Sequence, residues 1–586
     1  MQSVSDAYTP YSDERWSDFR VTFELIDVDA AEGAVPVATS EAAISQLQQT
    51  HNRITDMSNK IATLEHNFFV LDDSFIFPNE NDNGETGWWS DEISGSDGLF
   101  SKQQVLEFSF LETQSSVGFT IVFDNKSGEY ASDFTVQVYD SNGTLIDEEK
   151  ITGNSEVEYV CNMPVDGYSV VKILFLKTSL PYRHVRVCEV IFGIIQTFTK
   201  NNSTKLKLLY EISPTMNNLP TNELSITIEN ADRKYNMINP KGIYKYLQEG
   251  QKMSVELGIG SKKDSLEYIN MGSFYFANAS AEDDAMTAQI TAYDKFYALD
   301  RGLYRRGTNE TGTVSSIVND IILDSGLNIS VSVTEEVANR VIGKNIPIVT
   351  HREALRLVAQ AARCSCYIDR NGVLTFKELV LSESIDTLNN NNLYQPAKVD
   401  VDEYINTVET KAISLGIASR DATEIFTGTI SIYGTKEVWI TYNAAQITTP
   451  TITGGTIDSV DYYLYACRMT ITAADDVNLT LKGNNIDSYE TLFSAQNLEG
   501  NPESIITVDN PLIRADFAQN FAEWMLSTIQ KRVSYSLSER ANPAREIGDT
   551  IKIYDAYNEN RDAIVIKEEY NFDGTLKGST EAWEGI

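Results

Sequence analysis

The residues best suited to ligand chemistry are two adjacent tryptophans in the segment Gly87-Trp88-Trp89-Ser90. An indole offers a large flat apolar face on which a sugar ring can stack, and it carries one N–H donor. Tryptophan is also a core-packing residue, and paired aromatics near the edge of a module favour that interpretation. The sequence leaves both open, so Trp88 and Trp89 are the candidate carbohydrate contacts.

The cysteines and histidines show no pattern for metal binding or nucleophilic catalysis. An odd number of cysteines, five, predicts buried thiols rather than a disulfide framework: Cys161, Cys188, Cys364, Cys366 and Cys467. The pair in Cys364-Ser365-Cys366 is tighter than the usual zinc spacing. The histidines stand singly, at His51, His66, His184 and His351. We therefore expect no metal and no cofactor.

Carboxylates are abundant, with 84 Asp and Glu residues, so a pair at glycosidase spacing could arise by chance in any fold. The sequence has no Gly-x-Ser-x-Gly elbow, no His-Glu-x-x-His motif and no phosphate-binding Gly-Lys-Ser loop. We expect no catalytic residue and no enzymatic activity.

The chain is strongly acidic, with a formal net charge of −37. Nucleic-acid binding depends on Lys and Arg displacing counterions, so this charge argues against it. The acidity favours solubility, with a surface selected for a partner or a channel as the alternative. The first twenty residues do not form a signal peptide, and no run of 18 apolar residues predicts a membrane span. We expect synthesis and folding in a cytoplasm.

The elements around these residues are mostly strands. Between Thr204 and Leu299, apolar residues recur at every second position, which is typical of half-buried strands. The apolar positions of these strands are Leu206 to Ile212, Leu224 to Ile228, Met253 to Ile259, Phe274 to Phe276 and Ala288 to Ala292. Five strands in this length predict a small antiparallel barrel or sandwich. The segment Asn230 to Gly250 between them predicts a loop with Tyr-Asn and Asn-Pro-Lys-Gly turns and a short helical turn.

The pattern changes to helical after Thr308. Apolar residues from Val314 to Ile322 follow helical spacing between a Thr313 start and a Gly326 stop. Thr350 and Glu353 form a capping box for a second helix, in which we expect His351 to be exposed. Cys366 to Glu378 predicts a hairpin. Further strands are expected at Thr407 to Leu415, Thr427 to Tyr433, Glu437 to Tyr442, Tyr462 to Thr472 and Val477 to Leu481, before a helix after Asn510-Pro511 and closing strands.

The order of these pieces resembles the tail hub proteins of tailed phages and phage-tail-like bacteriocins. The resemblance rests on Ile228-Glu229-Asn230, the Tyr235-Asn236 turn, Gly272-Ser273-Phe274 and Ala292-Tyr293-Asp294 in the first barrel. It continues in Arg540-Ala541-Asn542-Pro543, Glu546-Ile547-Gly548-Asp549 and Tyr570 to Leu576 near the C-terminus. Residues 400 to 502 match only in strand content.

A second resemblance concerns the segment before the barrel. Pro78, the Trp88-Trp89 pair, Pro181-Tyr182-Arg183 and Glu189 to Gly193 resemble the galactose-binding-like jelly roll inserted in tail hubs of phages of Gram-positive hosts. We expect the ends of this insertion to lie close together, since the strands on either side belong to one barrel.

Together these observations predict a mainly β chain with α+β segments: two small β-barrels, a helical α+β domain between them, and the inserted jelly roll. The expected boundaries are 1–72 (start of the first barrel), 73–193 (jelly roll), 194–306 (first barrel), 307–381 (α+β domain), 382–509 (second barrel) and 510–586 (C-terminal α+β segment).

The hub resemblance implies a structural protein of the virion, at the tail tip or baseplate, assembled in the bacterial cytoplasm. It implies a homotrimeric ring that joins the tail tube or distal tail protein to a spike, fibre or lysin and encloses the tape-measure protein. We expect both barrels around one channel with an acidic wall. The chain ends soon after the last hub-like strand, so we expect a lysin to be another polypeptide. A glycan-binding adhesin and a cell-wall hydrolase remain alternatives.

Overall fold

The computed structural model describes residues 2–5, 8–79, 83–236, 238–239, 242–282, 285–418, 422–497, 504–554 and 560–584. The fold is mainly β with α+β segments, as predicted. Pro240 and Lys241 of the expected Asn-Pro turn lie outside the described residues, whereas the expected helical turn is the 3₁₀ segment η2 (Tyr244–Tyr246). None of the helices within these ranges is long and apolar enough to cross a membrane.

A single large sheet organises the described chain, and its first half is the expected first barrel. In order, its strands are β11 (Gly193–Phe198), β1 (Trp16–Ile26), β14 (Lys252–Lys262), β15 (Ser265–Ser280), β16 (Thr287–Tyr293), β13 (Glu223–Glu229) and β12 (Ser203–Glu211). Alternate residues such as Leu224, Ile226 and Ile228 are buried in one core. These strands confirm the period-two predictions for residues 206 to 292, and they curl around that core.

The second half of the same sheet is made by the C-terminal strands. The strands are β34 (Asn560–Phe572), β35 (Leu576–Glu584), β32 (Val533–Glu539), β25 (Lys398–Val401), β33 (Thr550–Tyr554) and β24 (Asp386–Leu388). They surround a small core of their own that includes Leu537, Ile551 and Val565. β12 pairs antiparallel with β34, from Leu206 opposite Phe572 to Glu211 opposite Lys567, so the two halves share one ladder.

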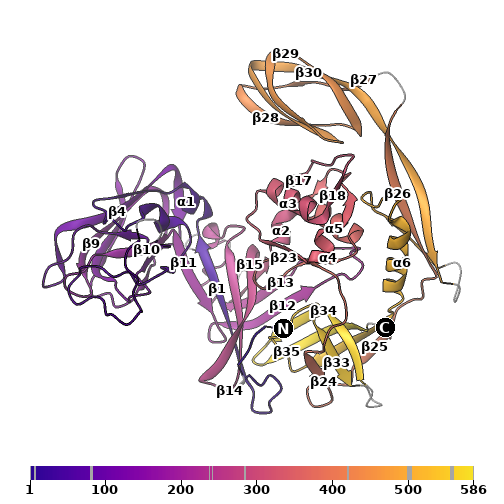
Figure 1. The fold of residues 1–586 in the computed structure, drawn as a ribbon. Coiled ribbons are helices and arrows are strands. Elements are labelled where there is room, and N and C mark those ends of the chain that lie inside the picture. Colours follow the sequence, from indigo (N-terminus) through magenta and orange to yellow (C-terminus); the bar gives the residue numbers. More distant parts are fainter. Residues whose placement is uncertain are drawn as a thin grey trace.

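This pairing places the second barrel differently from the expected 382–509. The strands of 407–509 form a separate sheet: β26 (Thr407–Ile417), β27 (Thr423–Ile430), β28 (Gly434–Thr441), β29 (Ala445–Tyr462), β30 (Ala466–Gln496) and β31 (Ile505–Asp509). The two strands expected around residues 462–481 belong largely to the single strand β30, which begins at Ala466. Tyr462 ends β29, and residues 463–465 form the turn between the two strands. β29 carries few apolar residues in register, so its strand was not predicted. In Figure 1 this sheet, in orange, rises away from the large sheet.

The jelly-roll segment is a two-sheet β sandwich with its own aromatic core. One sheet has the order β2 (Val35–Ala38), β4 (Leu99–Ser116), β9 (Val165–Thr178), β6 (Ala131–Tyr139) and β7 (Leu145–Ile151). The other has β3 (Trp88–Trp89), β10 (Arg186–Ile191), β5 (Phe119–Phe123) and β8 (Glu158–Cys161). The helices α1 (Val28–Gly33) and η1 (Leu47–His51) lie against it.

The sandwich takes up more of the N-terminal region than the boundary at residue 73 implies. Only Trp16–Ile26 of that region joins the large sheet, whereas Val35–Ala38 pairs with β4. The chain leaves the barrel after Ile26 and returns at Gly193, and these two residues are direct partners across β1 and β11. The ends of the insertion therefore lie side by side, as expected, but the insertion begins near Asp27.

The α+β domain packs in the middle of the molecule (Figure 1). Its helices are α2 (Phe296–Leu299), α3 (Val314–Ser325), α4 (Glu335–Ala338) and α5 (His351–Ala361). Its strands are β17 (Leu303–Tyr304), β18 (Thr311–Thr313), β19 (Val331–Val333), β20 (Val341–Gly343), β21 (Val349–Thr350), β22 (Ser365–Ile368) and β23 (Leu374–Lys377), the last pairing with β22 as the predicted hairpin. The helix α6 (Ala518–Ile529) shares their core.

The helix caps agree with the sequence, with one correction. Thr313 caps α3, which ends at Gly326 with φ 69°, and Thr350 Oγ1 accepts from the Glu353 backbone N–H at 3.2 Å. The expectation that His351 is exposed is wrong: it is 4% exposed, and its Nε2 lies 3.0 Å from Asp324 Oδ2. The first turn of α5 packs against β17, and the Tyr304 ring of β17 lies edge to face with the His351 ring, with the ring centres 6.2 Å apart.

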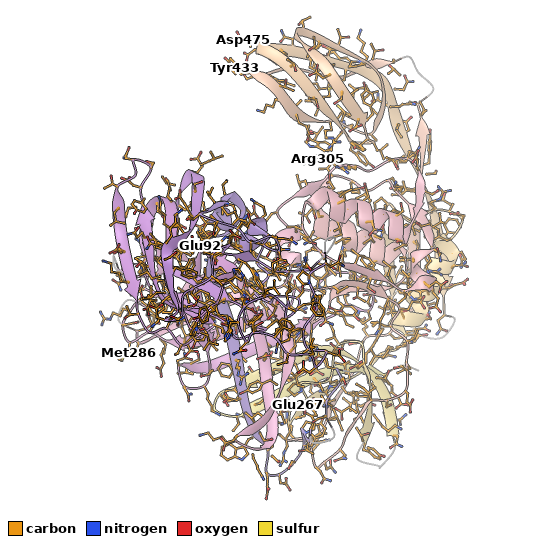
Figure 2. All side chains as sticks on the ribbon, turned by 60° about the vertical axis from the view of Figure 1, so that its left-hand side comes forward. Glu92, Glu267, Met286, Arg305, Tyr433 and Asp475 are labelled. Carbon is orange, nitrogen blue, oxygen red and sulfur yellow. The ribbon has the colours of Figure 1, made fainter. Side chains whose placement is uncertain are left out.

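The sheet of 407–509 contacts the α+β domain at its near end. The Leu464 backbone N–H donates to the Gly307 carbonyl at 2.7 Å. The Arg305 guanidinium lies 5.6 Å from the centre of the Trp439 ring. Figure 2 shows Arg305 at this contact and Tyr433 and Asp475 at the far end of the sheet. This sheet is thus attached to the α+β domain at two places. One is the end that carries Leu464 and Trp439, and the other is the part of β26, β30 and β31 that shares a hydrophobic core with α6.

Candidate functional site at the junction of the two barrels

The two tryptophans singled out in the sequence lie in the interior of the sandwich. Trp88 and Trp89 are 0% and 1% exposed, and their indole N–H groups donate to the carbonyls of Ser40 and Thr86. Trp88 packs against Phe175. A sugar ring finds no exposed indole face here, so the burial matches the core-packing interpretation.

The cysteines are buried free thiols, as predicted. Burial raises the pKa of the Cys364 thiol to about 12, so this sulfur is not a nucleophile at neutral pH. Within the described residues, no group of three or more His, Cys, Asp and Glu side chains could hold a metal ion.

A fully buried cluster of charged side chains lies inside the second barrel, around Arg545. This guanidinium is 0% exposed and bonds to three carboxylates on different strands or their flanks: Glu539, Glu568 and Asp386. Nε lies 2.5 Å from Glu568 Oε1, and Nη1 lies 3.1 Å from Asp386 Oδ2. Thr580 joins the same network. Because all three guanidinium nitrogens of Arg545 donate hydrogen bonds, this side chain fixes the positions of β24, β32 and β34 relative to one another.

The N-terminal segment before β1 is attached to this cluster. The Tyr11 hydroxyl donates to Asp386 at 2.6 Å, and the Tyr8 hydroxyl donates to Asn542 at 2.9 Å. Arg15 donates to the carbonyls of Ala541 and Leu576. The N-terminal segment therefore runs along the second barrel before the chain enters the first barrel as β1. Its hydrogen bonds link the two barrels.

A second buried arginine lies between the α+β domain and the two barrels. Arg370, at the tip of the β22–β23 hairpin, is 6% exposed and donates to the carbonyls of Pro543 and Arg545. Its guanidinium also lies within 6 Å of the ring centres of both Tyr210 and Tyr570, which contact each other edge to face. The hairpin is therefore anchored to both halves of the large sheet.

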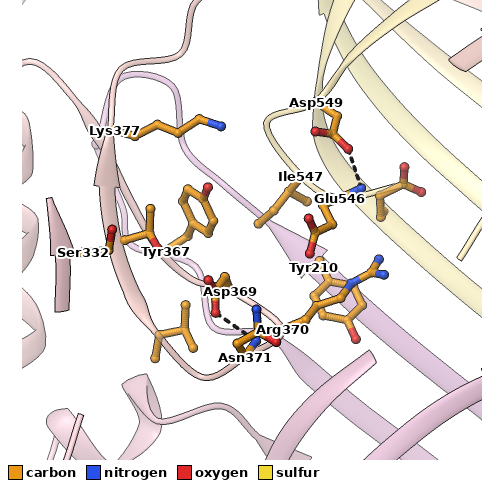
Figure 3. Close-up of a pocket in the computed structure, with 13 residues that line it drawn as sticks. Tyr210, Ser332, Tyr367, Asp369, Arg370, Asn371, Lys377, Glu546, Ile547 and Asp549 are labelled. Atoms are coloured by element: carbon orange, nitrogen blue, oxygen red, sulfur yellow. Dashed lines mark hydrogen bonds between the residues drawn. The ribbon is translucent and has the colours of Figure 1, made fainter. Parts of the chain in front are cut away.

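A cavity of about 280 Å³ adjoins this arginine. Figure 3 shows Tyr210, Tyr367, Asp369, Glu546 and Asp549 around it, with the hairpin on one side and the C-terminal turn on the other. Asp369 and Asp549 accept from backbone N–H groups of Asn371 and Glu546, both at 2.9 Å. These two carboxylates in the cavity wall therefore have a structural role, because each holds a turn.

Burial shifts several acids toward their neutral forms. It raises the pKa of Asp294 to about 7, opposed by hydrogen bonds from the backbone N–H groups of Asn222 and Phe296. Burial also raises the pKa of Glu568, and the Arg545 guanidinium opposes this. Raised pKa values occur at acid–base sites, but these groups are enclosed and paired within the fold. Their geometry suits a rigid joint between domains.

Sequence reasoning missed both arginines. Arg370 and Arg545 occur in turn segments, Asp369-Arg370-Asn371-Gly372 and Ala544-Arg545-Glu546, where an arginine ordinarily points to solvent. The signal that could have pointed to Arg545 is the Asn542-Pro543 turn two residues before it, which is part of the hub resemblance.

The comparisons with known proteins give structural likenesses only. No family model matches the chain, and no curated protein sequence does. Similar solved structures include a tail protein from Neisseria meningitidis MC58, at 9% identity and a TM-score of 0.40, covering 66% of this chain and 94% of that one. A 43 kDa tail protein of prophage MuSo2 from Shewanella oneidensis matches at 11% identity and a TM-score of 0.38, covering 66% and 93%.

A third match is the prophage tail protein gp18 from Listeria monocytogenes EGD-e, at 11% identity and a TM-score of 0.35, covering 77% of this chain and 94% of that one. All three are tail proteins. Because each TM-score lies below 0.5, these likenesses do not by themselves assign this chain a family or a function.

Proposed function

We propose that this chain is a structural tail hub protein of a tailed phage or phage-tail-like particle. One observation carries the proposal: two curled halves of one sheet, each with its own core, are joined edge to edge through β12 and β34. We take these two halves to be the two barrels that the hub resemblance implies, although the sequence predicts the second barrel in residues 382–509.

Two barrels per chain match a symmetry requirement. Tail tubes in the families resembled are hexameric, whereas the device below them is three-fold. Three copies of a two-barrel chain present six similar surfaces, and this allows a ring to join the two. We propose a homotrimer that contacts the tail tube or distal tail protein above and a spike, fibre or lysin below, and that encloses the tape-measure protein. Its place is the tail tip or baseplate of a virion assembled in the bacterial cytoplasm.

The buried arginines supply the rigidity that such a ring needs. Arg545 fixes the strands of the second barrel, and Arg370 fastens the α+β domain to both barrels. A fixed angle between the barrels would set the curvature of the ring. The excess of acidic residues would give the channel an acidic wall, where like charge keeps DNA from adhering.

Labelling tests the location. Purified particles are decorated with gold-tagged antibody against this chain and imaged by electron microscopy. We expect label at the distal end of the tail; label along the tube or on the capsid would contradict the proposal.

A cell-wall zymogram tests the enzyme alternative, since a clear band abolished by one carboxylate substitution would establish hydrolysis. Glycan binding by the isolated sandwich would favour the adhesin alternative.

A further inference from the structure

A second cavity, of about 290 Å³, lies where the sandwich meets the first barrel. Its wall comes from β1, α1, β10, β11, β14 and β15 and from the segment after η1. The apolar side includes Ile26, Ala31, Ile191 and Ile195. Its charged residues are Glu24, Lys252, Glu189 and Arg53. The cavity is separate from the Arg545 and Arg370 networks.

Only one of the two carboxyl oxygens of Glu189, in this wall, has a hydrogen-bond partner among the described residues. The residue is 2% exposed, and its Oε1 accepts from the backbone N–H of Arg53 at 3.2 Å. Its Oε2 is buried and has no hydrogen-bond partner among the described residues. Leaving a buried polar oxygen unpaired costs free energy, so such an atom calls for an explanation. Other buried glutamates differ: Glu65 pairs with Arg186, and Glu568 pairs with Arg545.

The remaining charges leave one cation without a partner. Lys252 Nζ lies 3.2 Å from Glu24 Oε1, so these two neutralise each other. The Arg53 guanidinium makes no ion pair or hydrogen bond with the described residues, and its side chain is exposed. Its backbone adopts φ 68°, in the left-handed region that a side chain disfavours. The bond to Glu189 holds Arg53 beside the cavity in that conformation.

The cavity therefore offers an unpaired carboxyl oxygen, an unpaired guanidinium and an aliphatic wall. We propose that it binds a small zwitterion with an aliphatic body, such as a free amino acid: the ammonium lies on Glu189, the carboxylate on Arg53, and the side chain on Ile26, Ile191 and Ile195. Carboxylate recognition by arginine is charge-assisted, and the volume admits a molecule of this size. The ammonium would complete the hydrogen bonds of Glu189.

Protonation of Glu189 makes the binding pH-dependent. Burial raises the pKa of Glu189 to about 8, opposed by the backbone N–H group of Arg53. At neutral pH the free site holds a proton, which an ammonium ligand must displace. Affinity should therefore increase as pH rises toward 8, with proton release. Glu24, Lys252, Tyr275 and Arg53 also face the site, and Glu85 adds to the raised pKa of Glu189.

Isothermal titration of the purified full chain tests the proposal with three matched probes: L-leucine, isopentylamine without the carboxylate, and 4-methylpentanoate without the ammonium. We expect leucine to bind more tightly than either single-charge probe, with an enthalpy that depends on buffer ionisation because a proton is released. Leucine affinity should fall roughly tenfold in Arg53→Gln and in Glu189→Gln. Glu158→Gln, on the same module outside the cavity, should bind as the wild type does.

Arg53 is exposed, so its substitution tests the site even if Glu189→Gln does not fold. Absence of leucine binding between pH 7 and 8.5 would overturn the proposal. Equal binding of isopentylamine and leucine, or unchanged affinity in Arg53→Gln, would overturn it as well. The titration needs no ring or particle, so its outcome is separate from that of the proposed tail function.

Discussion

Glu568 and Arg545 form a fully buried ion pair, with Arg545 Nε 2.5 Å from Glu568 Oε1. The pair lies where β34 leaves its ladder with β12 and enters the second barrel. The same guanidinium bonds to Glu539 and Asp386. The joint between the barrels thus depends on one cation among three acids.

Replacing this cation should be severely destabilising. Arg545→Met leaves buried carboxylates without their partner, and we expect a loss of roughly 3 to 5 kcal/mol in the free energy of unfolding. Urea denaturation followed by tryptophan fluorescence measures it. Arg514→Met, at an exposed ion pair with Asp516, is the control and should change stability by less than about 1 kcal/mol. Similar losses in the two variants would contradict the assigned role.

Stability should decrease as pH rises from about 4 to 7. Burial raises the folded-state pKa of Asp294 to about 7, above the ordinary value of 3.8 for an aspartate. Between these values the folded state binds more protons than the unfolded state, so its contribution is present at low pH and lost as pH rises through 7. Denaturation across this range should show a shallower slope for Asp294→Asn than for the wild type. An identical slope would mean that Asp294 titrates normally.

The sandwich should be removable. Ile26 and Gly193 are paired neighbours, so a short Gly/Ser turn can replace residues 27 to 192 without moving β1 or β11. We expect a soluble protein with the oligomeric state of the full chain, measured by light scattering. The replacement also exposes the small junction core of Ile26 and Ile195, which polar substitutions can compensate. Loss of all soluble protein even then would show that the sandwich is integral.

Trp88 should contribute stability rather than recognition. Trp88→Ala removes a fully buried ring, and we expect the sandwich to lose roughly 3 to 5 kcal/mol. The exposed Trp16, at 48%, is the matched control, and its replacement by Ala should cost far less. Thermal unfolding measures both. A Trp88→Ala variant that is folded and equally stable but has lost binding to a glycan array would contradict this prediction and indicate that Trp88 binds sugar.

Much of this fold follows from local sequence. The alternation of Leu224, Ile226 and Ile228, the Thr313 cap and the Gly326 stop are local signals, and each matches the structure. Pairing between distant strands is not local: nothing near Leu206 indicates that Phe572 lies opposite it. The second barrel expected in residues 382–509 therefore differs from the strands that join the large sheet, which are β24, β25 and β32–β35. β30 looked like two strands because Asp475 and Asp476 interrupt its apolar pattern, at the point where its partner changes from β28 to β27.

The candidate site was less predictable than the fold. Burial of His351 depends on β17 and Asp324, and burial of Arg370 depends on turns about 170 residues away in the chain. An isolated sequence pattern assigns such residues to the surface, because charged side chains are rarely buried without partners. Their partners become visible only when the sheet is assembled.

A cryo-electron microscopy map of the assembled particle tests the central claim most directly. The account predicts three copies of this chain at the distal end of the tail, with the barrel of β1 and β11–β16 and the barrel of β24, β25 and β32–β35 alternating around one channel with a net acidic wall. A map in which either barrel lies outside the ring, or in which the chain is absent from the tail tip, would contradict it.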